Sequence, residues 1–371
     1  MRIKKNTVQE VMDCLSEVAP LGYQEDYDNA GLLTGNANLE VENILLALDC
    51  TEAVIDDAIA KKCNVIVCHH PIIFKGLKSL TGSNYVERTV IKAIKNDMAI
   101  IAWHTNLDNV LKQGVSEKMA HKLGLKNLRI LQPKANLLFK LVTYIPEAYF
   151  TSVTEALFAT GAGKIGEYAE CGFSVQGEGT FTPSANANPT VGKPLQKETT
   201  TELRFETMVP DHLLQTVIAA LQFAHPYEEV AYEVYPLKNI HQEIGSGVIG
   251  NFDNSIPKED FLAHLKKQFG LQTFKHTHCN NYLIKTVAVC GGAGSFLIHT
   301  AKAQKADAYI TSDIKYHEFF DADNQLLLCD IGHYESEIAT LEIFNDVLSK
   351  KFVNFATLFT DTNTNPVIYY K

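Results

Sequence analysis

Four histidines and two carboxylates stand at, or shortly after, the ends of apolar segments in this chain. Two of the histidines are adjacent, and each of the other two precedes a carboxylate by four positions, which puts both side chains on one face of a helix. Imidazole and carboxylate groups are ligands of Zn, Fe and Mn, and a carboxylate can bridge two ions. The pattern therefore predicts two divalent metal ions, which activate water or polarise phosphoryl and carbonyl oxygens. The predicted ligands are His69, His70, His104, Asp108, His333 and Glu337.

Each of these residues has a simpler interpretation when it is taken alone. A histidine at a strand end is usually a hydrogen-bonded structural residue, and a histidine four positions before a glutamate usually lies on a solvated helix face. The prediction of a metal site therefore depends on the joint pattern, in which three apolar segments end in the same way.

Other polar residues near predicted strand ends are weaker candidates. The stretch Cys290–Ser295 follows a strand and opens a helix, so it would either cradle a phosphate on its backbone N–H groups or form a tight turn. Glu335 and His317 are the two residues that we consider as a catalytic general base. Asp313 and Lys315 would either line the same pocket or lie exposed at the surface.

Alternating strands and helices must position these residues. Short apolar strands are predicted at residues 44–49, 65–68 and 99–103, with helices before and between them, and Thr7 and Thr51 are the predicted N-caps of two of these helices. The segment 28–31 is predicted to be a turn. Strands that are apolar on both faces are typical of a parallel α/β sheet. The carboxyl ends of such strands meet at one edge of the sheet, so histidines far apart in sequence can converge there.

The pattern changes to β-α-β-β-α-β between residues 133 and 240, an order that is typical of a ferredoxin-like domain. Strands are predicted near residues 138–144, 172–182, 200–208 and 230–235, and helices near 151–160 and 213–223. The predicted fold class is therefore α/β, with a split outer α/β domain at residues 1–132 and 241–371 and a ferredoxin-like α+β insert at residues 133–240. The outer segments would form one split domain or two similar lobes.

The composition limits the possible classes of function. A formal net charge of -10 argues against a broad nucleic-acid surface, so we do not expect nucleic acid as a partner. No apolar run reaches the ~18 residues that span a bilayer, and the first residues do not resemble a signal peptide. The eight cysteines form no Cys-x-x-Cys pair. We therefore expect a cytoplasmic protein that has a small-molecule partner and no membrane contact.

Six motifs, in this order, resemble those of the Ngg-interacting factor three-like family, whose members are often named GTP cyclohydrolase type-two homologues. The motifs are Tyr27–Leu32, Cys68–Phe74, Trp103–Asp108, Cys290–Gly294, Ser312–His317 and Gly332–Glu337. The segment His225–Glu229 is typical of the family's inserted domain, which resembles the PII and CutA proteins.

The resemblance implies a dinuclear metal site made by the same six ligands, with Asp108 and Glu337 as bridging carboxylates, and a homohexamer. A GTP cyclohydrolase-like activity would use activated water to attack C8 of a purine, whereas the same site would also suit phosphoester hydrolysis. The substrate would then be a nucleotide-like small molecule. The alternative is a non-enzymatic regulatory or metal-handling protein, in which the insert senses a ligand or binds a partner.

Overall fold

The computed structural model describes residues 5–370, and the chain divides into two compact units. The outer unit combines residues 1–133 with residues 242–371, and the insert comprises residues 134–241. The two outer segments therefore belong to one compact unit, although more than a hundred residues of sequence separate them.

The first sheet of the outer unit has five strands within the described residues, in the order β1-β4-β3-β2-β15. Their bounds are β1 (Gly31–Thr34), β2 (Ile44–Ala47), β3 (Val65–Cys68), β4 (Ala99–Ala102) and β15 (Thr357–Phe359). All residues of β2, β3 and β4 are buried, because these strands are apolar on both faces and both faces are covered. These three strands are parallel, as predicted. The strand β15, which was not predicted, pairs with β2 in parallel orientation, whereas β1 is antiparallel to β4.

Four helices accompany this sheet: α1 (Val8–Val18), α2 (Glu52–Ala60), α3 (Tyr85–Lys95) and α11 (Thr340–Lys351). Thr7 caps α1 in a reciprocal capping box with Glu10, and the Thr51 hydroxyl accepts from the backbone N–H of Val54 at the start of α2. Both N-caps were predicted from the sequence. The core of this region is formed by apolar residues of the strands and of α2, such as Leu45, Ile55 and Ile100.

The second sheet of the outer unit has the order β11-β14-β13-β12-β10-β5. Its strands are β5 (Lys126–Pro133), β10 (Gly245–Pro257), β11 (Lys275–His276), β12 (Leu283–Ala293), β13 (Ala308–Ser312) and β14 (Leu327–Asp330). The strands β12, β13 and β14 are parallel, but β5, β10 and β11 join the sheet in antiparallel orientation. The expectation of a parallel sheet was therefore correct only for the strands that alternate with helices.

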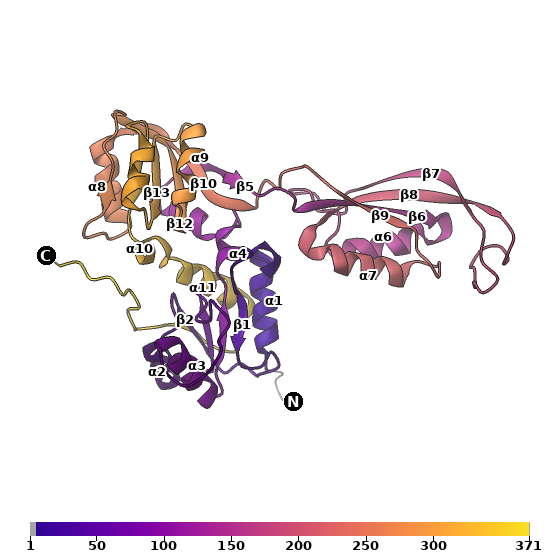
Figure 1. The fold of residues 1–371 in the computed structure, drawn as a ribbon, viewed down its shortest axis with the longest axis horizontal. Coiled ribbons are helices and arrows are strands. Elements are labelled where there is room, and N and C mark those ends of the chain that lie inside the picture. The colour runs from indigo at the N-terminus through magenta and orange to yellow at the C-terminus, as the bar shows by residue number, and fades with distance from the viewer. Residues whose placement is uncertain (1–4, 371) are drawn as a thin grey trace. The chain divides into compact units, whose positions relative to one another are not determined.

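Helices of the second lobe are α5 (Val115–Leu123), α8 (Lys258–Gln268) and α9 (Ile298–Ala303), and two short helices, α4 (Thr105–Asp108) and α10 (His333–Glu337), follow strand ends. Figure 1 shows the two sheets of the outer unit, each with its own helices, and α10 and α11 near the junction of the two lobes. Short 3-10 helices lie at Leu21–Tyr23, Ser295–Leu297 and Tyr316–Ala322.

The insert has the predicted β-α-β-β-α-β order, with a four-stranded antiparallel sheet in the order β7-β8-β6-β9. Its elements are β6 (Leu138–Pro146), α6 (Phe150–Ala159), β7 (Gly172–Phe181), β8 (Glu198–Pro210), α7 (Leu214–Ala224) and β9 (Tyr232–Pro236), with 3-10 turns at Glu147–Tyr149 and Asp211–Leu213. Both helices pack on the sheet through Leu157 and Leu221, which confirms the ferredoxin-like α+β arrangement.

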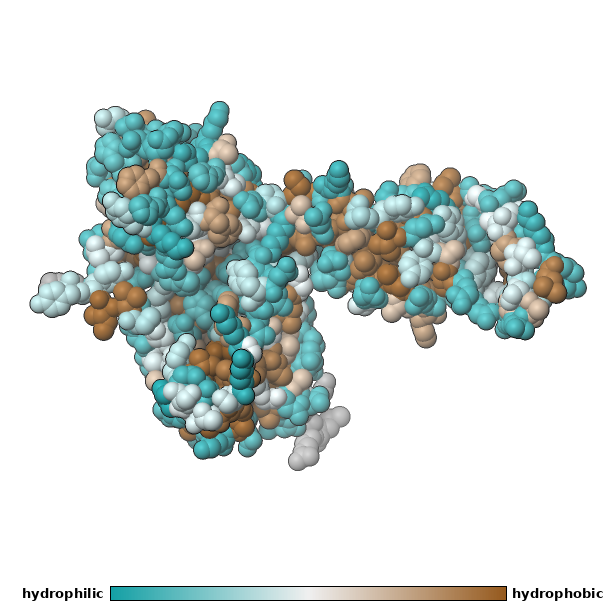
Figure 2. Space-filling model, in the orientation of Figure 1, coloured by the Kyte–Doolittle hydropathy of each residue, from teal (hydrophilic) through white to brown (hydrophobic). Residues whose placement is uncertain are grey.

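The hydropathy of the visible surface is mixed. In Figure 2 hydrophobic residues gather on the visible face of the insert in the region of α6 and α7. Within residues 5–370, no helix combines the length and the apolar character that crossing a membrane requires.

Candidate metal centre

Strand ends from both sheets of the outer unit bring the six predicted ligands together. His69 and His70 follow β3, His104 is the N-cap of α4 after β4, and the helix α10 after β14 begins at His333. The ligand atoms form three groups, in each of which all atoms lie within 4.8 Å of one another. The groups are His69–His70–His104, His70–His333–Glu337 and His69–Asp108–Glu337.

Each of the four histidines has its Nδ1 atom held by an oxygen. The Nδ1 atoms of His70, His104 and His333 lie 2.7, 2.8 and 2.6 Å from carboxylate oxygens of Asp49, Asp28 and Asp313, respectively. His69 Nδ1 lies 2.9 Å from the backbone carbonyl of Trp103. These contacts fix the ring orientation and leave each Nε2 atom for the centre of the cluster, which is how metal-binding histidines are usually supported.

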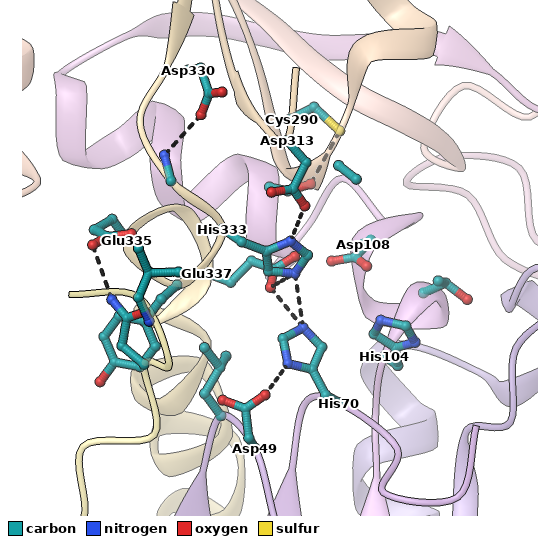
Figure 3. Close-up of a pocket in the computed structure, with 18 of the residues that line it drawn as sticks. Asp49, His70, His104, Asp108, Cys290, Asp313, Asp330, His333, Glu335 and Glu337 are labelled. Carbon is teal, nitrogen blue, oxygen red and sulfur yellow. Dashed lines mark hydrogen bonds and ion pairs between the residues drawn. The ribbon is translucent and has the colours of Figure 1, made fainter. Parts of the chain in front are cut away.

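Glu337 lies at the middle of the cluster and its side chain is buried (3% exposed). Its Oε2 atom is 2.9 Å from His70 Nε2 and 3.0 Å from His333 Nε2, and its Oε1 atom is 3.8 Å from His69 Nε2. Figure 3 shows His70 and His333 facing each other across this carboxylate, with Asp49 and Asp313 behind them. A carboxylate in this position could bridge two ions.

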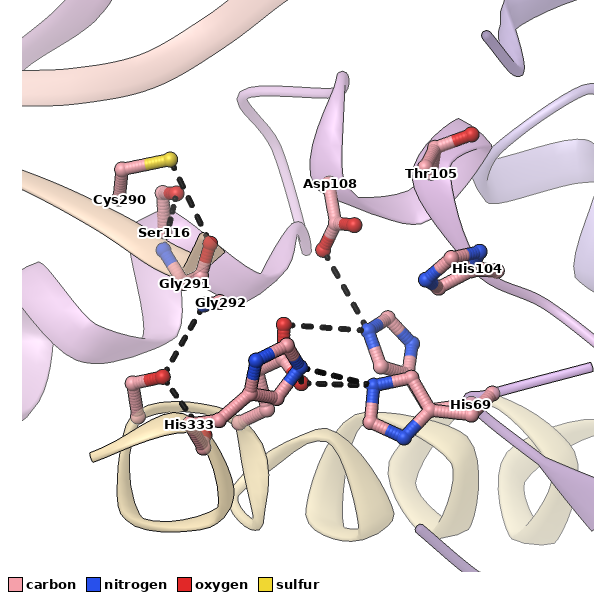
Figure 4. A network of polar contacts seen from close by, with 12 residues as sticks. His69, His104, Thr105, Asp108, Ser116, Cys290, Gly291, Gly292 and His333 are labelled. Carbon is pink, nitrogen blue, oxygen red and sulfur yellow. Dashed lines mark hydrogen bonds and ion pairs between the residues drawn. The ribbon is translucent and has the colours of Figure 1, made fainter. Parts of the chain in front are cut away.

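Two buried ligand atoms have no hydrogen-bond partner. His69 Nε2 and Asp108 Oδ1 face each other at 3.6 Å, the contact drawn as a dashed line in Figure 4. At this distance neither atom forms a hydrogen bond. Since a buried polar atom without a partner is destabilising, such atoms indicate a group that completes the site. A cation between an imidazole nitrogen and a carboxylate oxygen would satisfy both, so this donor pair fits a metal ion.

Burial and neighbouring charges perturb the pKa values of the cluster. Burial lowers the pKa of His69 to about 4, so its imidazole is neutral and can act as a ligand. Burial, together with the negative charge of Glu337, raises the pKa of Asp108 well above its usual value. Burial acts in the same direction on Glu337, but hydrogen bonds from His333 and His70, together with the nearby His69 imidazole, outweigh it and hold the pKa of Glu337 well below its usual value.

Neighbouring carboxylates raise the pKa values of His70 and His333. Burial by itself lowers the pKa of His70, but hydrogen bonds to Asp49 and Glu337 outweigh it and raise that pKa to about 9. His333 is affected in the same way by Asp313 and Glu337, and its pKa rises to about 11. Protons therefore compete with a metal ion for these two imidazoles.

The glycine stretch Cys290–Ser295 leaves space for the Glu337 side chain, a role that the sequence did not suggest. Gly292 has a φ of +63°, and a Cβ atom on it would lie 2.2 Å from Glu337 Oε1. The backbone N–H groups of Gly291 and Gly292 already donate to the hydroxyls of Ser116 and Ser336. The stretch therefore makes room for Glu337, and these two N–H groups are not free to cradle a phosphate.

A cavity of about 840 Å³ opens beside the cluster, and His70, His104, Asp108, His333 and Glu337 line it. Of the two residues considered as a general base, Glu335 also lines the cavity, and its Oε1 atom accepts from Asn365 Nδ2 at 3.2 Å. His317 lies exposed on the 3-10 helix Tyr316–Ala322, packs against Tyr316 and Phe320, and does not line the cavity. Asp313 lines the cavity, whereas Lys315 does not.

Two of the carboxylates that orient the histidines were missed in the sequence. Asp28 was assigned to a simple turn, and Asp49, two residues after β2, was not considered as a site residue. Asp28 also accepts from the Thr105 backbone N–H at 3.0 Å and from the Thr105 hydroxyl. The sequence did contain a signal for Asp49, because this residue stands at the end of an apolar run, as the predicted histidine ligands do.

The chain is similar to a defined protein family over almost its whole length. The family model Duf34/NIF3 (NGG1p interacting factor 3) matches residues 6–366. The GTP cyclohydrolase 1 type 2 homolog of Bacillus subtilis is 36% identical over 362 residues, which cover 96% of this chain and 97% of that protein. The protein of the same name from Halalkalibacterium halodurans is 37% identical over 366 residues, covering 97% of this chain and 98% of that protein.

A solved structure shows the same fold. The crystal structure of a Bacillus cereus protein related to NIF3 superimposes with a TM-score of 0.84 at 35% sequence identity, and the match covers 99% of this chain and 100% of that chain. Chains of this similarity share both the outer unit and the insert.

Proposed function

Because the chain belongs to the Duf34/NIF3 family and its predicted ligands converge, we propose that it is a metal-dependent hydrolase with a dinuclear site. The substrate would be a nucleotide-like small molecule, which activated water opens or hydrolyses. The observation that carries this proposal is the common orientation of the four histidines, whose Nδ1 atoms are all engaged behind the cluster. A solvated helix face or a structural histidine would not produce that arrangement four times.

The six clustered residues would hold two divalent ions, for which Zn, Fe and Mn suit this imidazole and carboxylate set. Asp108 and Glu337 are the carboxylates that we propose as bridging ligands, since both approach His69 Nε2. When bound, such ions polarise a substrate oxygen and lower the pKa of water.

The protein's own groups would then orient the substrate and move protons. Glu335 is the acid–base candidate that remains, because it lines the cavity and is not hydrogen-bonded to a histidine of the cluster. Its contact with Asn365 would fix the carboxylate at the cavity wall. Asp49 and Asp313 would hold the ligand histidines and take no direct part in proton transfer.

The test combines metal analysis of the purified protein with a turnover screen of GTP, other nucleotides and phosphoesters. We expect about two metal ions per chain in the native protein, and loss of both metal and turnover in His104→Ala and Glu337→Ala. His299→Ala is the matched control, because His299 is exposed (76%) and lies outside the cluster. Unchanged metal content in both ligand variants would exclude this site.

One observation favours the alternative, a regulatory role of the insert. The insert contains a cavity of about 690 Å³ of its own, which Tyr227, Glu202 and the segment around Thr182–Val191 help to line. A small ligand of the insert would be compatible with either role of the metals. Two metal ions without turnover of any compound in the screen would favour this regulatory or metal-handling function.

We also propose that the chain forms a homohexamer, as its family resemblance implies. Mass photometry of the full chain would test this assembly, with a single species of about six times the 41.2 kDa chain mass as the expected result. A monomer at micromolar concentration would contradict it.

A further inference from the structure

The cavity beside the metal centre is poor in groups that bind phosphate. Lys275 is the one lysine or arginine among the described residues that line it. Its Nζ atom lies 2.6 Å from Asp330 Oδ2, so its charge is already paired. Sites for transferable phosphates normally supply several lysine or arginine side chains or free backbone N–H groups. The backbone N–H groups of Gly291, which lines the cavity, and of its neighbour Gly292 are also engaged, by the Ser116 and Ser336 hydroxyls.

Negative charge dominates the same cavity. Four carboxylates of the cluster line it: Asp49, Asp108, Asp313 and Glu337. Together they would offset the charge of two divalent ions. Glu335 lines the cavity in addition, whereas the charge of Lys275 is paired with that of Asp330. A triphosphate would therefore meet a net negative environment even when the metals are bound.

Exposed aromatic rings offer a different kind of contact at this cavity. Tyr27 (66% exposed), Phe74 (43%) and Phe296 (60%) all line it. The ring centroids of Tyr27 and Phe74 lie 6.2 Å apart, and Phe74 also lies edge-on to His104 at 6.3 Å. Large apolar rings left open to solvent at a cavity typically mark a ligand surface, and every nucleobase has a face that can stack on them.

From these observations we infer that the site binds an uncharged heteroaromatic ring, of nucleobase or nucleoside type, in preference to a nucleoside triphosphate. This inference rests on the proposed function of the same site and narrows its substrate class. The ring would contact Phe74 and its neighbours, and a carbonyl or ring nitrogen would face the ligand histidines. The cavity volume of about 840 Å³ is sufficient for a nucleoside.

Calorimetric binding of guanosine, GMP and GTP to the full chain loaded with Mn²⁺, at one ionic strength, tests the inference. We expect guanosine to bind at least tenfold more tightly than GTP, with GMP between them. Phe74→Ala should weaken guanosine binding at least fivefold, whereas Phe74→Tyr should keep it. Tyr282→Ala is the matched control, because Tyr282 is an exposed aromatic residue (82%) that does not line the cavity.

A second variant tests whether the negative charge of the cavity disfavours GTP. Glu335→Gln should raise the affinity for GTP at least threefold, because it removes one negative charge from the cavity wall. Metal content and melting temperature of each variant show whether the fold and the centre are intact.

The order of the three affinities and the turnover screen together distinguish a failure of this inference from a failure of the proposed function. Guanosine preference without turnover of any compound would support the inference and exclude the hydrolase. Turnover with GTP bound most tightly would support the hydrolase and overturn the inference. An absence of binding by all three compounds, or a Phe74→Ala variant with unchanged affinity, would also overturn it.

Discussion

His69 Nε2 and Asp108 Oδ1 lie 3.6 Å apart in the interior of the outer unit, and both lack a hydrogen-bond partner. The pair is unfavourable in the metal-free protein, because burial and the nearby Glu337 charge raise the pKa of Asp108 well above its usual value. A bound cation would make the same two atoms favourable. The pair therefore lowers the stability of the metal-free protein and at the same time favours the binding of a metal ion.

Replacement of Asp108 by asparagine should stabilise the metal-free protein and weaken its stabilisation by metal. We expect Asp108→Asn to raise the free energy of unfolding of the metal-free protein by about 1 kcal/mol, because it removes a buried ionisable group. The same variant should lose most of the increase in melting temperature that metal produces in the native chain. Chemical denaturation with and without chelator measures both effects. A metal-free variant less stable than the native chain would contradict the expectation.

Gly292 should tolerate no side chain. A Cβ atom at this position would lie 2.2 Å from Glu337 Oε1, and the φ of +63° is unfavourable for alanine. Gly292→Ala should therefore displace Glu337, reduce metal content and destabilise the chain by at least about 2 kcal/mol. Gly76→Ala is the control, since a Cβ atom there meets nothing within 4 Å. Equal metal content in the two variants would show that Glu337 is not a ligand.

Loss of an orienting carboxylate should weaken metal binding without removing a ligand. Asp28 is fully buried and fixes His104, and its hydrogen bonds to His104 and Thr105 outweigh burial and lower its pKa to about 2. Asp28→Ala should reduce metal affinity by roughly 10- to 100-fold, as such partners usually do. A competition titration with a metal indicator measures the change, with the exposed Asp26→Asn as control.

The pH dependence of stability should differ between the metal-free and metal-loaded protein. The pKa of His70 is raised to about 9 in the folded chain, so its contribution to stability is complete below about pH 6.5 and is lost as pH rises through 9. The metal-free protein should therefore lose stability over that range. Metal affinity should increase over the same range, because protons compete less for His70 as the pH approaches 9. Thermal melts from pH 6 to 9 test both trends, and parallel pH profiles would contradict them.

Removal of the insert should leave the metal centre intact. Pro133 at the end of β5 pairs with Gly245 at the start of β10, so the two chain ends left by an excision lie on adjacent antiparallel strands. A short Gly/Ser turn in place of residues 136–241 would close them as a hairpin. We expect this variant to be folded, by circular dichroism, with the metal content of the native chain. An unfolded product would show that the outer unit depends on the insert.

The sequence was sufficient to predict the elements whose pattern is local. The apolar strands β2, β3 and β4, the caps Thr7 and Thr51 and the order of the insert all depend on neighbouring residues, and each was predicted. The antiparallel strands β1 and β5 were missed, because they are mixed in polarity and their burial depends on partners remote in sequence.

The same distinction between local and long-range information applies to the candidate metal centre. Residue type and spacing were enough to select the six residues that cluster, since each stands at or near the end of an apolar strand. Only the tertiary structure decided that Asp28 and Asp49 orient the histidines, that Gly292 makes room for Glu337, and that His317 lies outside the cavity. These relations join segments that are distant in the chain, and a local sequence pattern carries no information on such distances.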